Sequence, residues 1–187
     1  EGSSGGGMGI FAALDKAVGP GDASFTLSIV DNEIYDIDSG VAGIYLRSNG
    51  GSPAGTSLME ATVTGNVIDE MGDFAFAGLY ALVGGNGPGD FSELGLDLGD
   101  NAIDLSDADY GGNAVYLEQG STDAHFNFPG YGGSPNGEAW GGTASADLTA
   151  FFAANGNVLT NGAFPSFADG TVDAQIVYGA TGYAFLP

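Results

Sequence analysis

The sequence predicts an all-β protein in which the chain winds into a short solenoid of about three stacked coils. Three segments with apolar residues at every second position lead to Asn32, Asn66 and Asn101, which are 34 and 35 residues apart. A period of two is typical of a strand with one buried face, and a regular spacing of roughly 20 to 50 residues is typical of stacked repeats. The 35 glycines, several of them inside the repeats, oppose a helical repeat.

Composition and charge limit the classes of function. The 187 residues are 43% hydrophobic, which is enough to bury the core of one domain. The formal net charge is −22, because 24 acidic residues face only Lys16 and Arg47. Without basic surface the chain does not displace counterions from phosphates, so nucleic acid is excluded and polyanionic glycans and anionic membranes are disfavoured. The absence of cysteine excludes disulfides and thiolate metal sites.

Charge and hydropathy favour an extracellular protein. The chain begins with Glu1, so we expect a processed chain or one excised from a longer protein. The longest near-continuous apolar run, residues 74–83, is about half of the roughly 20 residues that cross a bilayer, so we expect no membrane span. An acidic chain with almost no lysine suits seawater or brine, where salt screens self-repulsion. We therefore expect a secreted protein, outside the cell or on its surface.

The first 24 residues contain a leader and a predicted cap. Residues 1–9 are rich in Gly and Ser, which is typical of a flexible leader. Residues 10–24 are expected to form a capping helix and linker, because the apolar residues at 10, 11, 14, 17 and 18 follow helical spacing up to Gly19-Pro20-Gly21. Such a helix would cover the open end of the stack, as solenoids require.

The predicted coils occupy residues 25–125. Apolar residues stand at −7, −5, −3 and +2 from each of the three asparagines, which predicts a strand followed by a bend. Asparagine tolerates the left-handed conformation of a bend and hydrogen-bonds to identical residues above and below it, so we expect an asparagine ladder. Second strands are predicted at residues 41–46, 77–82 and 113–117, and glycine-rich loops at residues 47–57, 83–90 and 118–123.

This pattern resembles a known family. The apolar alternation, Asn-x-Ile and then Gly-Ile-Tyr-Leu at residues 43–46 resemble the repeats of the right-handed parallel β-helices of the pectate-lyase-like superfamily, especially those of long bacterial surface adhesins. The resemblance covers residues 25–123 and implies a fold, a right-handed parallel β-helix, but no activity. An antiparallel sandwich is the alternative.

Residues 126–187 are predicted to form an extension with a short helix and a terminal strand. Residues 126–133 and the Ala-rich stretch up to Asn155-Gly-Asn157 are similar to segments that follow the helix in such adhesins. Ser145 is the predicted N-cap of the helix, and Leu148, Phe151 and Phe152 form its apolar stripe. The terminal strand is expected at residues 171–178.

No catalytic residue is predicted, so we do not expect an enzyme. Lyases of this fold use Arg or Lys as the base, but Arg47 is the sole arginine and lies in a Gly/Ser/Pro loop. Clustered aspartates would suit a hydrolase, but three coils give little groove in which to desolvate a substrate. His125, the only histidine, is expected to pack in a turn. The glycine-rich residues 84–91 do not match a calcium β-roll, because the motif is out of phase and occurs once.

Acidic residues follow each ladder asparagine. Coils lie about 4.8 Å apart, so carboxylates in one column would repel unless they were screened or bridged by a hard cation. Two interpretations stay open, a Ca²⁺ site and a solvated acidic edge, and no cofactor is required by either the fold or the expected function. The candidate ligands are Asp36, Asp38, Asp69, Asp73, Asp104 and Asp107.

Aromatic residues offer a second candidate site. Tyr45, Tyr80, Tyr131 and Trp140 are candidates for stacking on neutral sugars. However, Tyr45 and Tyr80 stand at the same position of consecutive repeats, which equally suits an aromatic stack that stabilises the solenoid. Packing is the favoured interpretation.

The expected function is structural. Three coils make a stack only about 15 Å tall, so its two ends are important for how the protein associates. An uncapped end presents unpaired backbone groups onto which another coil can add, and head-to-tail contacts of this kind produce filaments. We expect an extracellular protein that assembles head-to-tail into a filament or surface layer, or a module of a large adhesin. The alternatives are a carbohydrate-binding adhesin module for neutral glycans and, ranked lower, a polysaccharide-cleaving enzyme fragment.

Overall fold

The computed structural model contains fourteen strands and one helix within the residues that it describes. These residues are 7–15, 22–37, 41–50, 57–72, 75–85, 90–106, 112–121, 123–131, 143–167 and 176–179. The elements are β1 (Ile10–Asp15), β2 (Ala23–Val30), β3 (Glu33–Ile34), β4 (Ala42–Asn49), β5 (Ser57–Thr64), β6 (Val67–Ile68), β7 (Ala77–Val83), β8 (Glu93–Gly99), β9 (Ala102–Ile103), β10 (Asn113–Gln119), β11 (His125–Pro129), α1 (Thr143–Ala154), β12 (Val158–Leu159), β13 (Ala163–Phe167) and β14 (Ile176–Gly179).

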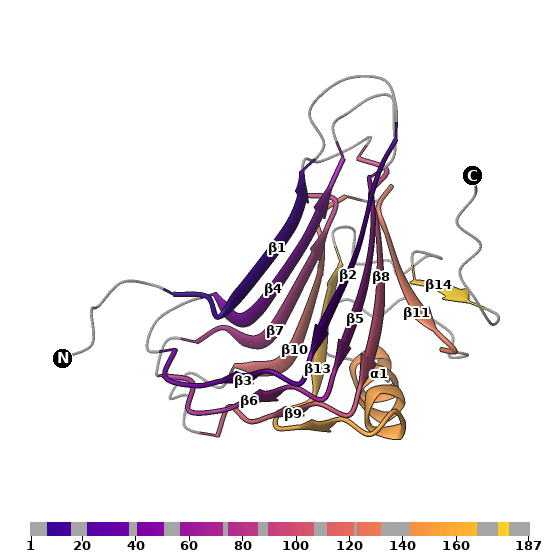
Figure 1. The fold of residues 1–187 in the computed structure, drawn as a ribbon. Helices are drawn as coiled ribbons and strands as arrows, with labels where there is room; N and C mark the ends of the chain where they lie inside the picture. Colours follow the sequence, from indigo (N-terminus) through magenta and orange to yellow (C-terminus); the bar gives the residue numbers. More distant parts are fainter. Residues whose placement is uncertain are drawn as a thin grey trace.

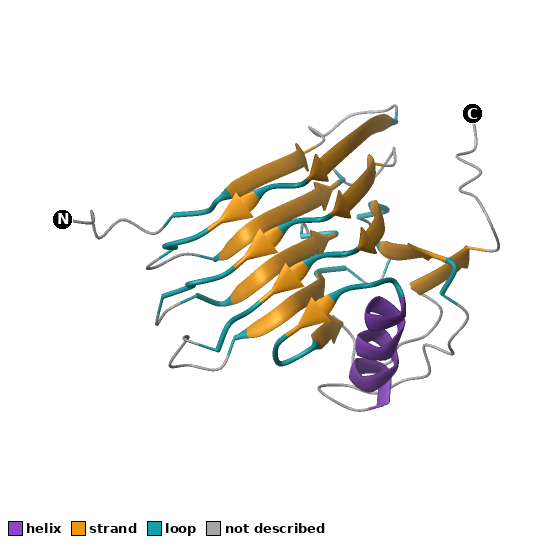
Figure 2. Ribbon diagram, turned by 60° about the horizontal axis from the view of Figure 1, so that its bottom comes forward, coloured by secondary structure: helices purple, strands orange, loops and turns teal. Residues whose placement is uncertain are grey.

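The strands form three parallel sheets. Sheet A has the order β1-β4-β7-β10-β13, sheet B the order β14-β11-β8-β5-β2, and sheet C the order β12-β9-β6-β3. The chain passes through sheets B, C and A in turn and returns to sheet B one strand further along (Figures 1 and 2). We call one such passage a circuit. All strand pairs of the described residues are parallel, which excludes the antiparallel sandwich, and the described elements are mostly strands with a single helix.

The circuits are in register with the sequence repeat. In sheet B, Leu27 pairs with Ala61, and Ala61 pairs with Leu96. The apolar alternation therefore points the same positions inward in every circuit, and most of these side chains are buried in one core. A slip of one residue would turn a whole strand inside out, so the buried face fixes the register.

Glycines in sheet A give room to the isoleucines of sheet C. A Cβ atom on Gly43 would lie 2.7 Å from Cγ2 of Ile68, and one on Gly9 would lie 2.7 Å from Cγ2 of Ile34. Both distances are shorter than real Cβ contacts, so Gly9 and Gly43 leave no room for a side chain beside these isoleucines, whereas β10 has Ala114 at the corresponding position. The isoleucines that follow the ladder asparagines by two residues can then pack between the sheets.

The predicted N-terminal helix is wrong. Residues 10–15 form β1, which pairs with β4 from Ile10–Ile44 to Asp15–Asn49. Ile10, Ala12 and Leu14 pack against the core at alternate positions. An isolated helix of this length is marginal in water, whereas a strand here gains a partner and a buried face. Residues 1–6 and 16–21 of the predicted leader and linker lie outside the described residues.

The predicted C-terminal helix is present as α1, and it lies at the opposite end of the stack, against β12 and β13 (Figure 2). It begins at Thr143, so Ser145 lies inside it and is not its N-cap. Leu148 and Phe152 are fully buried, and the helix ends just before Asn155-Gly156. The strands beyond residue 125 join the same three sheets, so the predicted boundary does not separate two architectures.

Candidate functional site

The three predicted ladder asparagines form one column at the bend between sheets B and C. Oδ1 of Asn66 accepts hydrogen bonds from N and Nδ2 of Asn32, at 3.0 and 2.8 Å. Oδ1 of Asn101 accepts the same pair from Asn66, at 3.0 and 2.9 Å. Asn66 and Asn101 are buried, and burial of an amide is costly unless it is hydrogen-bonded. The satisfied column therefore ties each circuit to the next at one fixed register.

The column has a fourth member, Asn157, which the sequence reasoning missed. N and Nδ2 of Asn101 donate to Oδ1 of Asn157, at 3.1 and 2.8 Å. The signal was present, because Asn157-Val158-Leu159 repeats the Asn-x-Ile pattern. It was hidden by the separation of 56 residues from Asn101, a stretch in which α1 lies between β11 of sheet B and β12 of sheet C.

The two ends of the ladder differ. N and Nδ2 of Asn157 donate to the carbonyl oxygen of Phe152 in α1, at 3.2 and 2.7 Å, and its Nδ2 also donates to the carbonyl of Leu98. The helix thus takes the acceptor position that a further asparagine would occupy. At the other end no described residue donates to Oδ1 of Asn32. Within the described part of the chain, the ladder is therefore closed by α1 at one end, and its other end, at β2 and β3, has no further donor.

The asparagines do not adopt the left-handed conformation that the sequence reasoning assigned to them. The residues directly before them do, with φ values of 55° at Asp31, 70° at Gly65, 55° at Asp100 and 82° at Gly156. The bend is therefore made by the preceding residue, where Asp and Gly tolerate positive φ. The asparagine is required for its amide.

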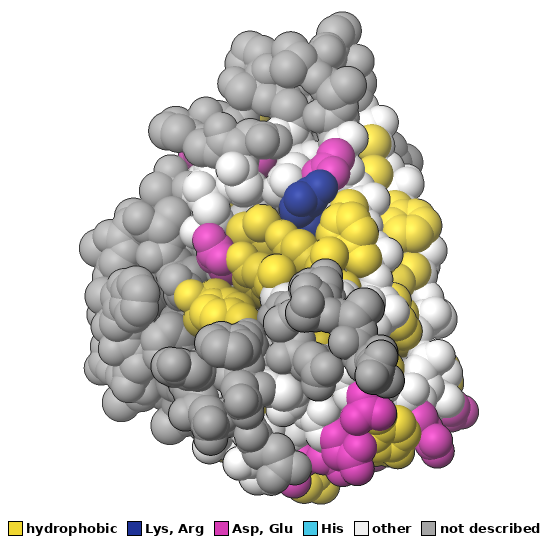
Figure 3. Space-filling model, turned by 90° about the vertical axis from the view of Figure 1, so that its left-hand side faces the viewer, with side chains coloured by type: hydrophobic (Ala, Val, Ile, Leu, Met, Phe, Trp, Pro, Cys, Tyr) yellow, Lys and Arg dark blue, Asp and Glu magenta, His cyan; other side chains and the backbone are white. Residues whose placement is uncertain are grey.

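Aromatic side chains form a second column, on the outer face of sheet A. The rings of Tyr45 and Tyr80 stack with centroids 4.6 Å apart and planes 2° from parallel. Phe11 lies 5.2 Å from Tyr45, and Tyr116 meets Tyr80 edge-on at 5.5 Å. Phe76 packs on Tyr116 at 4.4 Å. Figure 3 shows this apolar patch on the surface, with a basic side chain and carboxylates at its border.

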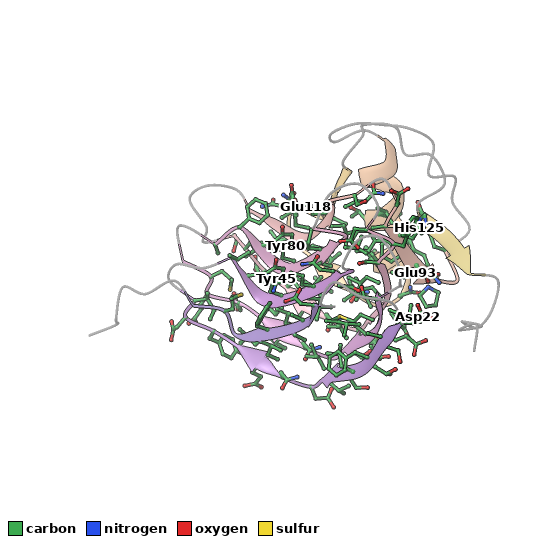
Figure 4. The ribbon with its side chains drawn as sticks, turned by 90° about the horizontal axis from the view of Figure 1, so that it is seen from above. Asp22, Tyr45, Tyr80, Glu93, Glu118 and His125 are labelled. Atoms are coloured by element: carbon green, nitrogen blue, oxygen red, sulfur yellow. The ribbon has the colours of Figure 1, made fainter. Side chains whose placement is uncertain are left out.

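Charged side chains contact the edge of this aromatic column. Arg47 forms an ion pair with Asp15, and its guanidinium lies 5.4 Å from the centre of the Phe11 ring. The hydroxyl of Tyr80 donates to the Glu118 carboxylate (Figure 4). Burial, together with this hydrogen bond, raises the pKa of Tyr80, and burial raises that of Tyr45. These tyrosines therefore stay neutral hydrogen-bonding groups at ordinary pH.

The geometry favours packing over sugar binding. Tyr45 and Tyr80 turn their ring faces toward each other, so these faces are not presented to a ligand. Tyr131 is not part of the patch, since it is only 5% exposed and packs against Phe128 and Phe151. Trp140 lies outside the described residues.

The described acidic residues do not form the single predicted column. Asp69 and Asp104 stand in register, one position after the paired Ile68 and Ile103. Asp36 stands one position later and matches Glu70, because Ile34 pairs with Ile68 and Ile37 bridges Met71. The paired turns are equally long over this stretch, but the aspartate stands four residues after Asn32 and three after Asn66, which breaks the column.

These carboxylates act as acceptors for their own turns. Oδ1 of Asp69 accepts from N of Glu70, and Oδ1 of Asp104 accepts from N of Ser106, both at 2.8 Å. The bond from Ser106, with one from Thr160, lowers the pKa of Asp104. Nowhere in the described ranges do three His, Asp or Glu side chains gather as a metal-ligand set. Asp38, Asp73 and Asp107 lie outside these ranges.

A buried polar corner between sheets A and B was not anticipated. Ser57 donates to Ser92 at 2.8 Å and lies 3.0 Å from the Ser48 hydroxyl, and Ser92 donates to Asp90. Oδ1 of Asp90 also accepts from N of Gly50 at 2.8 Å. Asp90 and the three serines are all buried. The repeat contained a signal, because Ser57, the first residue of β5, and Ser92, the residue before β8, stand at equivalent positions of consecutive repeats.

His125 stands apart from this corner. It begins β11, and its backbone N donates to the carbonyl of Ser92, but its ring nitrogens bond to none of the three serines. Figure 4 shows His125, Glu93 and Asp22 along one side of the stack, away from the aromatic column. Within the described residues, no serine, histidine and carboxylate are joined as a nucleophilic triad. The corner therefore serves to join circuits.

Comparisons with family models, curated proteins and solved structures give no match to this chain. Membership of the pectate-lyase-like superfamily therefore stays a prediction from the resemblance of the repeats. Among the described residues, no helix combines the length and the apolar character needed to cross a bilayer.

Proposed function

We propose that this chain is a right-handed parallel β-helix that serves as a non-enzymatic, extracellular structural module of a larger surface adhesin. The observation that carries the proposal is the asparagine ladder, which repeats the same hydrogen bonds from Asn32 to Asn157. A column of buried, mutually bonded amides supports a rigid stack of circuits.

The path of the chain supports the solenoid. Each circuit uses sheets B, C and A in the same order, and the ladder spacing of 34 or 35 residues accounts for one circuit. Parallel crossover connections are right-handed in nearly all proteins, which favours this hand. The similarity to adhesin repeats points to the same architecture.

The ends of the stack favour a module over a head-to-tail filament. Filament growth through the ladder needs free amide donors at one end and a free acceptor at the other. The donors of Asn157 are bonded to Phe152 and Leu98, so α1 would have to leave before another molecule could add there. A surface layer built by the same contacts meets the same obstacle.

The side chains of the candidate sites support a structural role. Asp69 and Asp104 hold their own turns, Tyr45 and Tyr80 cover each other, and Asp90 accepts bonds from two neighbouring segments. These contacts do not require calcium or another cofactor. The strong negative charge supports a location outside the cell, where salt screens it.

Sedimentation velocity, negative-stain microscopy and a polysaccharide assay together test this proposal. We expect the purified chain to be monomeric at micromolar concentration, to form no fibres, to be retained by no neutral glycan on an array, and to release no reducing ends from polysaccharides. Long uniform fibres would show that the chain polymerises and would contradict the proposed module. Saturable glycan binding that is lost in Phe11→Ala would show a binding function instead, and turnover of a polysaccharide would show a catalytic one.

A further inference from the structure

The hydroxyl of Tyr80 has a carboxylate base beside it. Tyr80 lies in β7, and Glu118 lies in β10, the next strand of sheet A. Glu118 stands two residues after Tyr116, the pairing partner of Tyr80, so both side chains project from the same face of the sheet (Figure 4). The hydroxyl of Tyr80 donates to Oε2 of Glu118. A hydrogen bond to an ionised acceptor is strong, and it gives the phenolic proton a direct path to a base.

The Tyr80 ring is in contact with several other rings. Its plane is 2° from parallel with that of Tyr45, at a centroid distance of 4.6 Å, and Tyr116 meets it edge-on at 5.5 Å. Phe76 also meets it edge-on, at 5.6 Å. The face of an aromatic ring carries partial negative charge and attracts positive charge. The stacked face of Tyr45 therefore favours the loss of an electron from the Tyr80 ring.

The partial burial of this pair favours the loss of an electron and a proton together. Tyr80 and Glu118 are both half-buried, so a molecule in solution can approach the ring while much of the site is kept from water. Loss of the proton alone is opposed, because burial and Glu118 raise the pKa of Tyr80. Loss of the electron alone would leave a positive charge in a partly desolvated ring. When the electron leaves and the proton moves to Glu118, both side chains end up neutral.

Two other tyrosines of the described part show which features distinguish Tyr80. Tyr45 has the stacked ring, but the Arg47 guanidinium interacts with its hydroxyl. A neighbouring cation opposes the loss of an electron, and a guanidinium does not accept a proton. Tyr35 is 41% exposed, and no described carboxylate accepts a hydrogen bond from its hydroxyl. Of these three tyrosines, only Tyr80 combines a stacked ring with a base at its hydroxyl.

We propose that Tyr80 and Glu118 form a redox site, at which Tyr80 gives one electron to a diffusible oxidant of the class of oxidising radicals and oxidised metal complexes, while its proton passes to Glu118. The O–H bond of Tyr80 breaks and an O–H bond forms on the Glu118 carboxylate. The oxidant is reduced by one electron, and Tyr80 becomes a neutral phenoxyl radical. The site thus takes up oxidising equivalents at the outer face of sheet A, whether or not the chain is a module of an adhesin.

The probe is ruthenium(III) tris-bipyridine, generated by a laser flash in the presence of a quencher, because this complex accepts an electron and no proton. Its positive charge favours encounter with a chain of net charge −22. Transient absorption separates a phenoxyl radical from an indole radical of Trp140, the one tryptophan of the chain. We expect a fast phase of phenoxyl formation on the intact protein. This phase should be slower in heavy water, because the proton moves with the electron.

Three variants assign the radical and the base. Glu118→Gln keeps an oxygen at the acceptor position but supplies no base, so the fast phase should slow by about a hundredfold. Tyr80→Phe removes the phenol and should abolish the fast phase. Tyr35→Phe removes an exposed phenol outside the aromatic column and should leave the fast phase unchanged. Circular dichroism confirms that the variants are folded.

The outcomes separate this redox site from general oxidation of surface tyrosines. A fast phase that survives in Tyr80→Phe, that is unchanged in Glu118→Gln, or that falls equally in Tyr35→Phe would overturn the proposal. An equal rate in heavy and ordinary water would also overturn it, because the proton would then not move with the electron. Glu118→Gln preserves the shape and the hydrogen bond of the site, so its rate still tests the proposal if Tyr80→Phe does not fold.

Discussion

Oδ1 of Asn101 accepts two hydrogen bonds from Asn66, one from the backbone N at 3.0 Å and one from Nδ2 at 2.9 Å. Asn66 in turn accepts two bonds from Asn32. One buried amide thus serves three circuits, as acceptor for one neighbour, as donor to the other, and as donor to carbonyls of Ile29 and Thr64. The stability of the stack should depend on these asparagines in a graded way.

Asn66→Ala should lower the free energy of unfolding by about 2–4 kcal/mol, because it leaves buried donors and acceptors of two circuits unpaired. Asn32→Ala is the matched control. Nothing in the described residues donates to Oδ1 of Asn32, so its removal should cost about 1 kcal/mol. Urea unfolding followed by circular dichroism measures both. Equal losses for the two variants would contradict the ladder as a cooperative element.

Gly65→Ala should destabilise the protein by about 2–4 kcal/mol, through two separable causes. Gly65 has a φ of 70°, and an added Cβ would overlap Oδ1 of Asp31. Gly130 has a similar φ of 79°, but nothing lies within 4 Å of an added Cβ. Gly130→Ala should therefore cost only the backbone strain, about 1 kcal/mol. Thermal unfolding of the two variants measures both losses of stability, and their difference is the cost of the clash with Asp31. If Gly130→Ala destabilises the protein as much as Gly65→Ala, the clash makes no contribution.

Asp90→Ala should cost about 2–4 kcal/mol, because N of Gly50 and the Ser92 hydroxyl lose a buried acceptor. Asp90→Asn retains an oxygen at the acceptor position and should restore more than half of this loss. Urea denaturation of both variants at neutral pH gives the comparison. If Asn rescues nothing, the negative charge of Asp90 matters and its role as a simple acceptor is refuted.

Stability should fall in alkali as the tyrosines of the aromatic column ionise. The pKa of Tyr80 is raised above 10.0 by burial and by Glu118, so the folded chain favours the neutral phenol. The corresponding stabilisation is complete below pH 10 and is lost as the pH rises from 10 toward the folded-state pKa. Urea unfolding between pH 8 and 11.5 should show this decline, and Tyr80→Phe should make it shallower. An unchanged slope in the variant would show that the Tyr80 hydroxyl is not coupled to folding.

Calcium should act on this chain only as a general divalent salt. Asp69 and Asp104 accept hydrogen bonds within their own turns, Asp36 stands out of register with them, and a net charge of −22 is screened by any cation. Calorimetric melting in Ca²⁺, in Mg²⁺ of equal ionic strength and after chelator treatment should give equal midpoints for the two metals. A midpoint several degrees higher in Ca²⁺ would establish a specific site, and variants of Asp38, Asp73 and Asp107 would then locate it.

The repeat itself was readable from the sequence, because the period-two pattern and the asparagine spacing coincide in residues 25–103 and the register follows both. The N-terminal strand was not, since Ile10, Leu14 and Val18 fit a helical spacing as well as Ile10, Ala12 and Leu14 fit a strand. The deciding signal was the similarity of Gly9-Ile10-Phe11 to Gly43-Ile44-Tyr45, at the same spacing of 34 residues as the ladder. Pairing with β4, which a local sequence pattern does not reveal, favours the strand over the helix.

The candidate sites were predictable only where they follow the repeat. The alignment of Tyr45 with Tyr80 came from equal spacing. The contacts of Arg47 with Asp15 and Phe11 did not, because residues 10–15 were predicted as a helix and Arg47 as part of a loop, whereas they lie in the paired strands β1 and β4. Asn157 was missed because a helix interrupts the period. The aspartates were misaligned because Asp36 stands four residues after its asparagine, whereas Asp69 and Asp104 stand three residues after theirs. Inserted elements and shifted positions within turns thus limit how far a repeat predicts side-chain geometry.

The uniformity of the ladder means that the stack can be lengthened or shortened in whole steps. Removing residues 32–65 would join Asp31 to Asn66, place one left-handed residue before an asparagine as before, and bring β1 against β7 and β2 against β8. The product would be about 4.8 Å shorter, with the same helix at one extremity and the same edge strands, β1 and β2, at the other. Evolution could in this way adjust the reach of such a protein by duplicating or losing single repeats, without redesigning either extremity.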